Sequence, residues 1–281
     1  MPASRSLSRG AKPPSRGVKS PGRADLTPPK RSYWPIVLIG LVAVLAVVIV
    51  TLPSSIIAHF LPPSVHAEDF SGSLWHGSAG RINVDARPAG ALEWRLHPAS
   101  LLGMTLAADL HWVKGGFVID AAVTLDRRGF TAKDVKGGGP IEDLHDFGIA
   151  PGWRGAAAID FGNLKSDFAK PLAASGEVQV SNLASAQFAD GADLGGYALR
   201  FPQDAVSADG NLAAQLSDTG GPVDLQAVVH YSSAERTAIL SGSLRERPDA
   251  PAALRSQLEN LAQMHARDSQ GRIPLDLEFA L

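Results

Sequence analysis

The chain has 281 residues, 45% of them hydrophobic and 19% charged, which is enough for one large domain or two small ones. It contains no cysteine, which excludes disulfides, thiolate metal sites and a cysteine nucleophile. Residues 1–32 hold eight Lys or Arg and one acidic residue, whereas the rest of the chain holds 18 basic and 27 acidic residues. This acidic balance argues against nucleic acid as a partner of the main domain, which would need a basic face.

Residues 1–32 consist largely of Ser, Arg, Lys, Pro and Gly and are predicted to form a disordered basic tail. Such a segment buries too little apolar surface to offset the entropy lost on ordering. Two roles remain open for the tail: its basic residues contact anionic lipid headgroups, or it only sets the membrane topology of the chain.

An uncharged segment, Ser32 to Ala58, follows the tail and contains the unbroken apolar run Ile36–Val50. As a helix, Trp34–Leu52 is about 29 Å long, which matches a hydrocarbon core of about 30 Å. Its Leu, Ile and Val residues favour insertion by about 4–8 kcal/mol. A cleaved signal peptide is the alternative, but its charged leader is normally much shorter than 32 residues. The segment predicts an uncleaved anchor and neck over residues 33–61.

The charges around this segment predict its orientation. Lys30 and Arg31 precede it, and the next basic Lys or Arg after it is Arg81. By the positive-inside rule the N-terminus stays in the cytoplasm, and residues 62–281 form a domain on the opposite side of the membrane. Tyr33 and Trp34 stand where an aromatic belt is expected at the membrane interface.

The domain over residues 62–281 is predicted to be mainly β, because two-residue alternation between turn clusters is its dominant pattern. We expect an elongated, curved antiparallel sheet, or a sandwich, with possible halves at residues 64–155 and 156–281. Lys114-Gly115-Gly116 predicts a hairpin turn, since glycine adopts positive φ without steric penalty. The expected strands are residues 80–86, 91–97, 104–112, 117–125, 155–161, 175–183, 196–201, 210–216, 223–230, 237–244 and 273–281.

Helical periodicity is confined to the C-terminal part and one short segment. Leu254, Leu258 and Leu261 recur on one face of a helix predicted over residues 251–266, which should pack against the sheet. A shorter helical turn is expected over residues 141–147. Residues 137–140, Gly-Gly-Gly-Pro, lack the Lys-Ser/Thr of a phosphate loop and are interpreted as a turn.

Residues 72–79 are Gly-Ser-Leu-Trp-His-Gly-Ser-Ala and residues 92–98 are Leu-Glu-Trp-Arg-Leu-His-Pro. These two motifs resemble those of the type II secretion system protein N family. The family's G-T-L-W-x-G-x-A element is matched in residues 72–79, with Ser73 in place of threonine, and its L-x-W-x-L-x-P element is matched in residues 92–98. Later elements are similar around residues 194–197 and 268–272, so that the resemblance extends over residues 36–281. The family-motif residues, interpreted as structural or partner-binding, are Gly72, Leu74, Trp75, Gly77, Leu92, Trp94, Leu96, Pro98, Gly196, Tyr197 and Gly271.

This resemblance implies an accessory envelope protein for export of folded proteins across the outer membrane. It implies that the single anchor lies in the bacterial inner membrane and that residues 62–281 form a periplasmic domain. The implied partners are type II secretion proteins of the inner-membrane platform or the secretin, together with the lipid bilayer. The long basic tail departs from the family, whose members usually begin close to the anchor. An envelope lipid-handling protein is the alternative, which a long open apolar face would favour and a filled sandwich core would exclude.

The motif residues have simple structural interpretations. Alternation places Leu92, Trp94 and Leu96 on one buried face of a strand, whereas Glu93 and Arg95 share the solvated face. Trp75, between two glycines, is expected in a strand packed into the core. A partner could instead use a sheet edge for β-augmentation.

The sequence contains no recognisable catalytic or metal-binding motif. The histidines show no paired metal spacing, no Gly-x-Ser-x-Gly elbow occurs, and the acidic cluster at residues 142–146 is typical of a solvated turn. We therefore expect no catalytic residue, no metal and no cofactor, and a periplasmic hydrolase is disfavoured.

Overall fold

The computed structural model describes residues 47, 51–186, 188–202, 211–235, 237–264 and 267–280. The predicted basic tail and nearly all of the predicted anchor, including Lys30, Arg31, Tyr33 and Trp34, lie outside these residues. Within the described part of the chain, no helix is both apolar and long enough to cross a bilayer.

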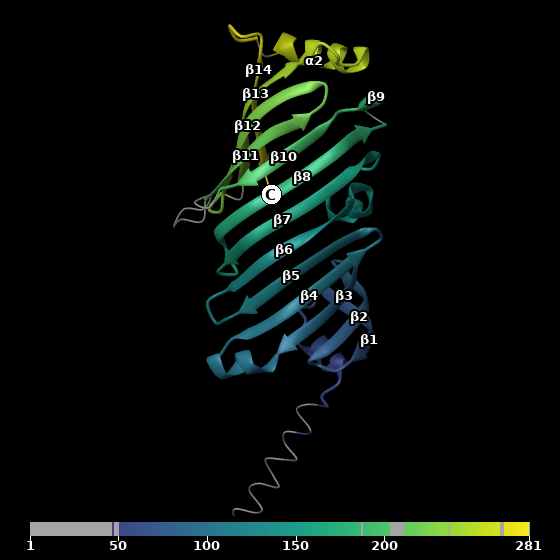
Figure 1. Ribbon diagram of the computed structural model, residues 1–281, viewed down its shortest axis with the longest axis vertical. Coiled ribbons are helices and arrows are strands. Elements are labelled where there is room, and N and C mark those ends of the chain that lie inside the picture. Colours follow the sequence, from purple (N-terminus) through teal and green to yellow (C-terminus); the bar gives the residue numbers. More distant parts are fainter. Residues whose placement is uncertain are drawn as a thin grey trace, which may run out of the picture. The chain divides into compact units, whose positions relative to one another are not determined.

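Fourteen strands of the described chain form one antiparallel sheet, which confirms the mainly β prediction (Figure 1). The strands follow one another in chain order from β1 to β14, except that β9 pairs with β8 beside this path. Strands β1 and β14 are the two edges, so the sheet is open and not a sandwich. The strands are β1 (Val65–Gly72), β2 (His76–Val84), β3 (Arg87–His97), β4 (Leu106–Lys114), β5 (Phe117–Leu125), β6 (Phe130–Pro140), β7 (Trp153–Ser166), β8 (Pro171–Ser185), β9 (Phe188–Asp193), β10 (Gly196–Phe201), β11 (Leu212–Gly220), β12 (Val223–Ser232), β13 (Thr237–Glu246) and β14 (Ile273–Ala280).

The expected strands all overlap observed ones, and the predicted hairpin joins β4 to β5 with Gly115 at φ +59°. Strands β1, β6 and β9 were not predicted. The interpretation of residues 137–140 as a turn is wrong, because they form the end of β6. A Cβ at Gly137 would lie 2.1 Å from the carbonyl oxygen of Val118, so the glycine lets neighbouring backbones approach closely.

The pairing register keeps one face of the sheet apolar from strand to strand. Leu92 lies opposite Trp112 and Leu96 opposite Ala108, whereas Glu93 on the other side lies opposite His111. Because side chains alternate along every strand, the same two faces continue across the sheet. We call them the apolar face and the polar face.

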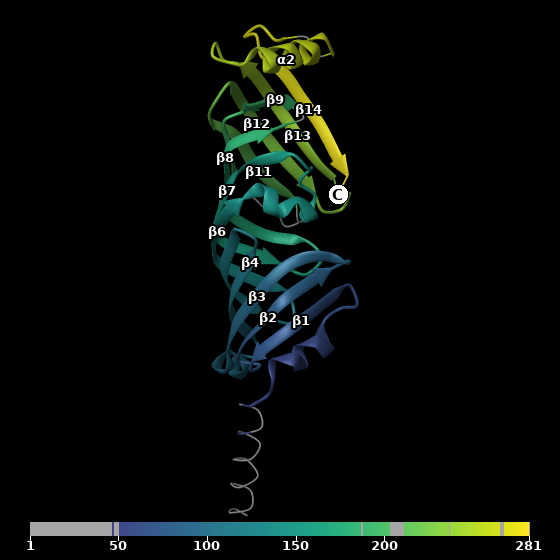
Figure 2. The same ribbon diagram turned by 90° about the vertical axis from the view of Figure 1, so that its right-hand side faces the viewer.

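Four short helical elements accompany the sheet, and three of them contribute side chains to its apolar face. The best packed is α2, where Leu254 (2% exposed) and Ile273 of β14 (0% exposed) share a core cluster with Val223 and Leu244. This confirms the predicted C-terminal helix, which lies at the β13–β14 end of the sheet (Figure 2). The elements are η1 (Ser54–Phe60), η2 (Pro98–Gly103), η3 (Ile141–Phe147) and α2 (Ala252–Met264).

Candidate functional site: a motif turn and the two faces of the sheet

The turn between β1 and β2 holds the first sequence motif. Gly72 has φ +79°, and a Cβ there would lie 2.4 Å from the carbonyl oxygen of His76, so only glycine closes this turn without strain. Ser73 N–H donates to that carbonyl at 2.8 Å. Trp75 therefore lies in the turn and is half-buried, in contrast to the expected core strand.

The second motif packs directly on this turn through Trp94, which is 8% exposed. A Cβ at Gly77 would lie 2.7 Å from the Trp94 ring, so the glycine makes room for the indole. The indole N–H donates to the carbonyl oxygen of Leu74 at 2.9 Å, and the Leu96 N–H donates to that of Trp75 at 2.7 Å. The two motifs thus form one structural unit, which we call the motif turn.

The chain that follows the predicted anchor is attached to the motif turn. Leu74 N–H donates to the carbonyl oxygen of Leu52 at 2.8 Å, and Pro53 forms an isolated β-bridge with Ser73. The next residues form η1, which contacts β1 and β2. Leu52, the last residue of the predicted anchor Trp34–Leu52, is therefore hydrogen-bonded directly to the motif turn.

An apolar cavity of about 560 Å³ lies on the apolar face of β1–β5, and we call it the N-terminal trough. All residues that line it are apolar, and Ile57 and Leu61 close it from the η1 side. Four of the lining residues belong to the two motifs: Leu74, Leu92, Trp94 and Leu96. The Trp94 N–H is already satisfied by Leu74, so the polar atom of this wall needs no further partner.

Two more cavities lie further along the apolar face. One of about 540 Å³ is lined by Ile141, Trp153 and Tyr197, and one of about 380 Å³ is lined by Phe130 and Phe168, among others. The Tyr197 hydroxyl donates to the carbonyl oxygen of Leu194 at 2.9 Å. Burial raises the pKa of Tyr197, and the nearby negative charge of Asp218 raises it further. The hydroxyl is a structural hydrogen-bond donor and not a candidate base.

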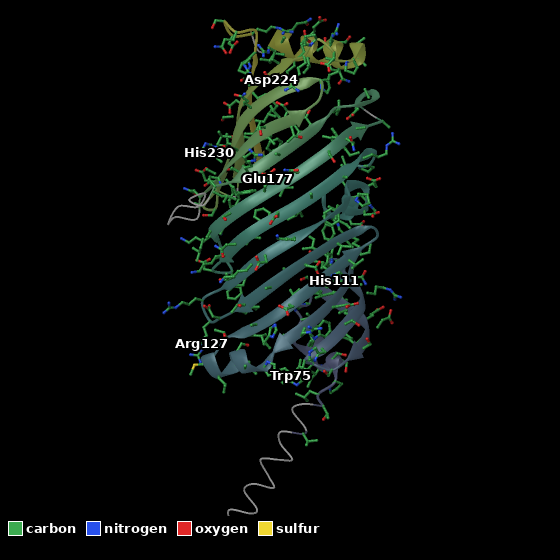
Figure 3. All side chains as sticks on the ribbon, in the orientation of Figure 1. Trp75, His111, Arg127, Glu177, Asp224 and His230 are labelled. Atoms are coloured by element: carbon green, nitrogen blue, oxygen red, sulfur yellow. The ribbon has the colours of Figure 1, made fainter. Side chains whose placement is uncertain are left out.

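The polar face carries a row of facing side chains, all polar except Val228, that runs from β1 to β14. Each member lies directly opposite the next in the pairing register, and His111 and Glu177 mark two of its positions in Figure 3. Opposite charges that face each other, such as Lys136 and Asp160, stabilise neighbouring strands, whereas Asp160 and Glu177 are facing like charges. We call this set of facing side chains the polar row: Ser71, Ser78, Glu93, His111, Asp120, Lys136, Asp160, Glu177, Arg200, Gln215, Val228, Ser241 and Asp276.

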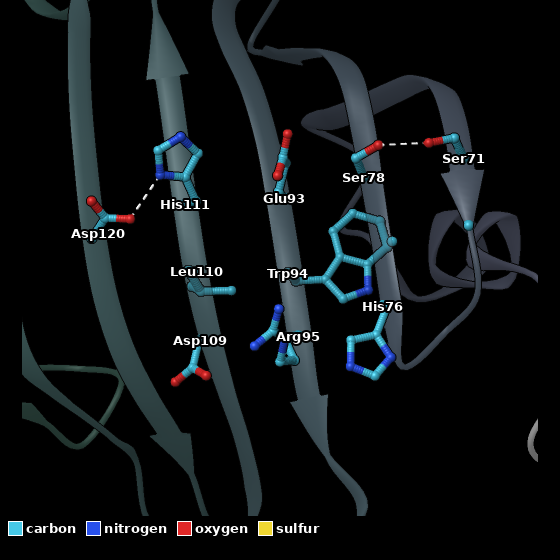
Figure 4. Close-up of a pocket in the computed structure, with 12 residues that line it drawn as sticks. Ser71, His76, Ser78, Glu93, Trp94, Arg95, Asp109, Leu110, His111 and Asp120 are labelled. Atoms are coloured by element: carbon cyan, nitrogen blue, oxygen red, sulfur yellow. Dashed lines mark hydrogen bonds and ion pairs between the residues drawn. The ribbon is translucent and has the colours of Figure 1, made fainter.

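A polar hollow of about 430 Å³ lies on the polar row next to the motif turn (Figure 4). His111 Nδ1 lies 2.7 Å from a carboxylate oxygen of Asp120, an arrangement that would suit a general base. However, the hydroxyls of Ser71 and Ser78 hydrogen-bond to each other at 2.8 Å. Among the described residues that line the hollow, no serine is therefore paired with a histidine as a nucleophile would be.

Ion pairs fix the polar row and the ends of the sheet. Hydrogen bonds from Gln179 and from Arg200, the latter at 2.8 Å, lower the pKa of the Glu177 carboxyl. Burial raises the pKa of Asp224, but hydrogen bonds from Arg272 at 2.7 Å and Arg245 at 3.0 Å outweigh it and lower the pKa overall. These carboxylates are held ionised as structural partners.

A further ion pair lies on the apolar face. Lys114 Nζ lies 2.5 Å from a carboxylate oxygen of Asp146 in η3, and the two side chains are only 10% and 19% exposed. The ammonium group also lies 5.0 Å from the centre of the Phe147 ring. The hydrogen bond from Lys114 lowers the pKa of Asp146. This pair fastens η3 to the hairpin of β4 and β5.

The described residues contain no group of three or more His, Cys, Asp or Glu that could hold a metal ion. A model of the family "Type II secretion system (T2SS), protein N" matches residues 63–276, from just before β1 into β14. The chain belongs to this family. No curated protein and no solved structure matches the chain.

The secretion protein N match confirms the family inferred from the sequence, and it begins after the predicted anchor. Of the eleven motif residues, the structure brings together the seven of the motif turn: Gly72, Leu74, Trp75, Gly77, Leu92, Trp94 and Leu96. Pro98 is exposed at the first position of η2. Their role as partner-binding residues remains a prediction.

The later secretion protein N residues lie apart from the motif turn. Gly196 and Tyr197 begin β10, and Gly271 has φ +73° in the turn before β14. Asp268 closes that turn by accepting the N–H of Arg272 at 2.8 Å. This turn places the Arg272 side chain where it pairs with Asp224, so Gly271 has a structural role at the β14 edge of the sheet.

Sequence reasoning missed the polar row and the Lys114–Asp146 pair. The sequence does show alternate polar residues in single strands, such as Glu93 and Arg95, which is the available signal for a polar face. Which of these residues face one another depends on register, which the pattern of one strand does not specify. Lys114 lies beside a hairpin turn in sequence, where a charged residue is normally solvated.

Proposed function

We propose that this protein is a non-catalytic accessory component of the type II secretion system. In this proposal Trp34–Leu52 anchors it in the bacterial inner membrane, with residues 1–32 in the cytoplasm and the sheet in the periplasm. The polar face is presented to proteins of the inner-membrane platform or to the secretin, for export of folded proteins across the outer membrane.

The observation that carries this proposal is the extent of the family match. It covers residues 63–276, which is nearly the whole sheet, so the sheet is the part shared with the family. The anchor is supported by the apolar run Ile36–Val50 and by the basic residues that precede it.

The arrangement of polar groups supports a scaffold without catalysis. Hydrogen bonds lower the pKa of Glu177, from Gln179 and Arg200, of Asp224, from Arg272 and Arg245, and of Asp146, from Lys114. A general base at neutral pH needs the opposite shift of its pKa. A row of paired polar side chains along an open sheet also provides a long surface for partner contacts.

Topology is tested with alkaline phosphatase fused to the C-terminus of the full chain, because this enzyme is active only in the periplasm. We expect an active fusion, and an inactive one when residues 34–52 are deleted. An inactive phosphatase fusion, together with an active C-terminal fusion to a reporter that works only in the cytosol, would contradict the proposed anchoring.

Partner contacts are tested by placing a photoreactive amino acid at Glu93 or Gln215 of the polar row. The matched controls are Leu92 and Leu216, one residue along on the apolar face. We expect cross-links to secretion proteins from the polar positions only, and accumulation of folded substrates in the periplasm when the gene is deleted. Normal secretion without the gene, together with no cross-links, would exclude the secretion role.

The apolar face favours a second candidate function, lipid handling in the envelope. Three cavities lie along the apolar face of this open sheet, and the N-terminal trough and the cavity at Ile141 and Tyr197 are the less polar ones. Extraction of the purified full chain and quantification of phospholipid tests this function, with about one molecule or more per chain expected for a carrier. Lipid at trace amounts would exclude it.

A further inference from the structure

The lining of the N-terminal trough is chemically suited to a hydrocarbon chain. Its walls come from η1, from β1–β5 and from the motif turn, and every lining residue is apolar. An extended peptide would bring backbone N–H and C=O groups into the trough, and these would lack partners there. A hydrocarbon chain has no such groups, and a volume of about 560 Å³ lies within the range of small-molecule sites.

The trough is covalently close to the apolar segment that precedes it. The run Ile36–Val50 ends two residues before Leu52, whose carbonyl accepts the N–H of Leu74 at 2.8 Å. Two residues span at most about 7 Å. Since the Leu74 side chain lines the trough, this cavity lies near the point where the chain leaves the predicted anchor.

The same end of the sheet exposes apolar side chains next to basic ones. Leu102 and Met104, on and just after η2, are 91% and 75% exposed. Leu106 at the start of β4 lies opposite Leu125 at the end of β5, so Met104 is close in register to the turn that carries Arg127 and Arg128. Figure 3 labels Arg127 in this turn. Exposed apolar residues beside basic residues are typical of surfaces that lie on anionic membranes.

We propose that the N-terminal trough binds one acyl chain of a phospholipid from the membrane on which η2 rests. Leu102 and Met104 enter the interfacial region, the arginines face the headgroups, and the acyl chain lies between η1 and β1–β5. This inference rests on the proposed anchoring, deepens the lipid-handling candidate, and does not depend on the secretion role.

The test uses the purified full chain in vesicles of phosphatidylethanolamine and phosphatidylglycerol. A small fraction of the phosphatidylethanolamine carries a photoreactive diazirine at the end of one acyl chain, and labelled peptides are mapped by mass spectrometry. Labelling of the predicted anchor is expected for any membrane protein. We expect additional labelling in β3 and β4, whose residues Leu92, Leu96 and Leu110 line the trough.

Two variants of β4 separate the trough from the rest of the sheet. Ala108 lines the trough, so Ala108→Phe should lower labelling of β3 and β4 by roughly tenfold. Ala107→Phe makes the same change one residue along, on the polar face, and should leave labelling unchanged. Circular dichroism establishes that both variants fold.

A third variant does not depend on tolerance of the core. Leu102 is almost fully exposed, so Leu102→Asp should fold normally and reduce trough labelling several-fold by weakening membrane contact. Labelling confined to the anchor, or equal labelling in Ala108→Phe and Ala107→Phe, overturns the inference. If phospholipid still co-purifies in that case, lipid handling stands without this site; an inactive phosphatase fusion would instead overturn the anchoring.

Discussion

The two ends of the sheet share the same alternation but differ in how the apolar face is covered. At β12–β14 the 13-residue helix α2 places Leu254 and Leu258 against Val223 and Leu244, and the space is filled. At β1–β5 the seven-residue η1 lies along the face without filling it, and the N-terminal trough remains. A repeated strand pattern thus builds a continuous face, and the helical elements decide where it is core and where it is cavity.

The difference between the two ends is tested most directly by the same Leu→Ala substitution at each end. Leu254→Ala should lower the free energy of unfolding by about 2–5 kcal/mol, because it opens a cavity in a filled cluster. Leu110→Ala should cost only about 1 kcal/mol, because this half-buried side chain already borders the trough. Urea denaturation of the full chain in detergent, followed by tryptophan fluorescence, measures both. Equal losses would mean that the trough is filled in solution.

The ion pair of η3 lies between these ends and keeps the middle of the apolar face covered. Lys114→Met leaves the Asp146 carboxylate at a site of low exposure without its cation, so the variant should be less stable than Lys114→Met/Asp146→Leu. Their urea midpoints give the order. The reverse order would show that Asp146 is solvated.

The same pair predicts a pH dependence. The pKa of Asp146 is lowered in the folded state, so its stabilisation is complete above the unfolded-state pKa of about 3.9 and is lost as the pH falls below it. The stability difference between wild type and Asp146→Asn should shrink as the pH falls from about 4 through the lowered pKa of the folded state. A difference that is constant with pH would contradict the ionised pair.

The motif turn at the N-terminal end is tested by adding one methyl group. Gly77→Ala places a Cβ 2.6 Å from the Ser73 carbonyl oxygen and 2.7 Å from the Trp94 ring, which should cost about 1–3 kcal/mol. Gly162→Ala is the control, because a Cβ there has no atom within 4 Å. Thermal unfolding of both variants is the measurement, and similar effects would show that Trp94 moves freely.

The polar row extends to both ends of the sheet, and substitutions in it should change the free energy of unfolding least. Glu177→Gln removes the charge that faces Arg200, at side chains 24% and 60% exposed, and should cost less than about 1 kcal/mol. The pKa of Glu177 is lowered, so this small effect should disappear as the pH falls below about 4. Denaturation at two pH values measures it, and a larger effect would indicate that the row is buried by a partner.

Much of the fold was predictable because alternation and turn residues act locally. The hairpin at Lys114-Gly115-Gly116 and the helix around Leu254 follow from neighbours in sequence. Strand β1 was missed because it follows closely after the prolines of the neck, and the end of β6 was missed because three consecutive glycines are typical of a turn. These glycines pair with residues of β5 and β7, and only the assembled sheet specifies which strands lie next to them.

The candidate site was predictable only in part. Alternation correctly assigned Trp94 to a buried face, and the two motifs identified the family. Their convergence in the motif turn was not predictable, because it depends on β2 pairing with β3 so that Gly77 lies opposite Trp94.

The sequence by itself determined the strand alternation, the charge asymmetry between tail and domain, the helix α2 and the membership of the secretion protein N family. These features depend on the order of neighbouring residues, which hydrophobic period and turn chemistry report directly. Only the tertiary structure decided which strands are edges, which polar side chains face each other, and that η1 leaves an apolar trough where α2 leaves a filled core. Those outcomes depend on the register and packing of distant segments, which local patterns do not encode.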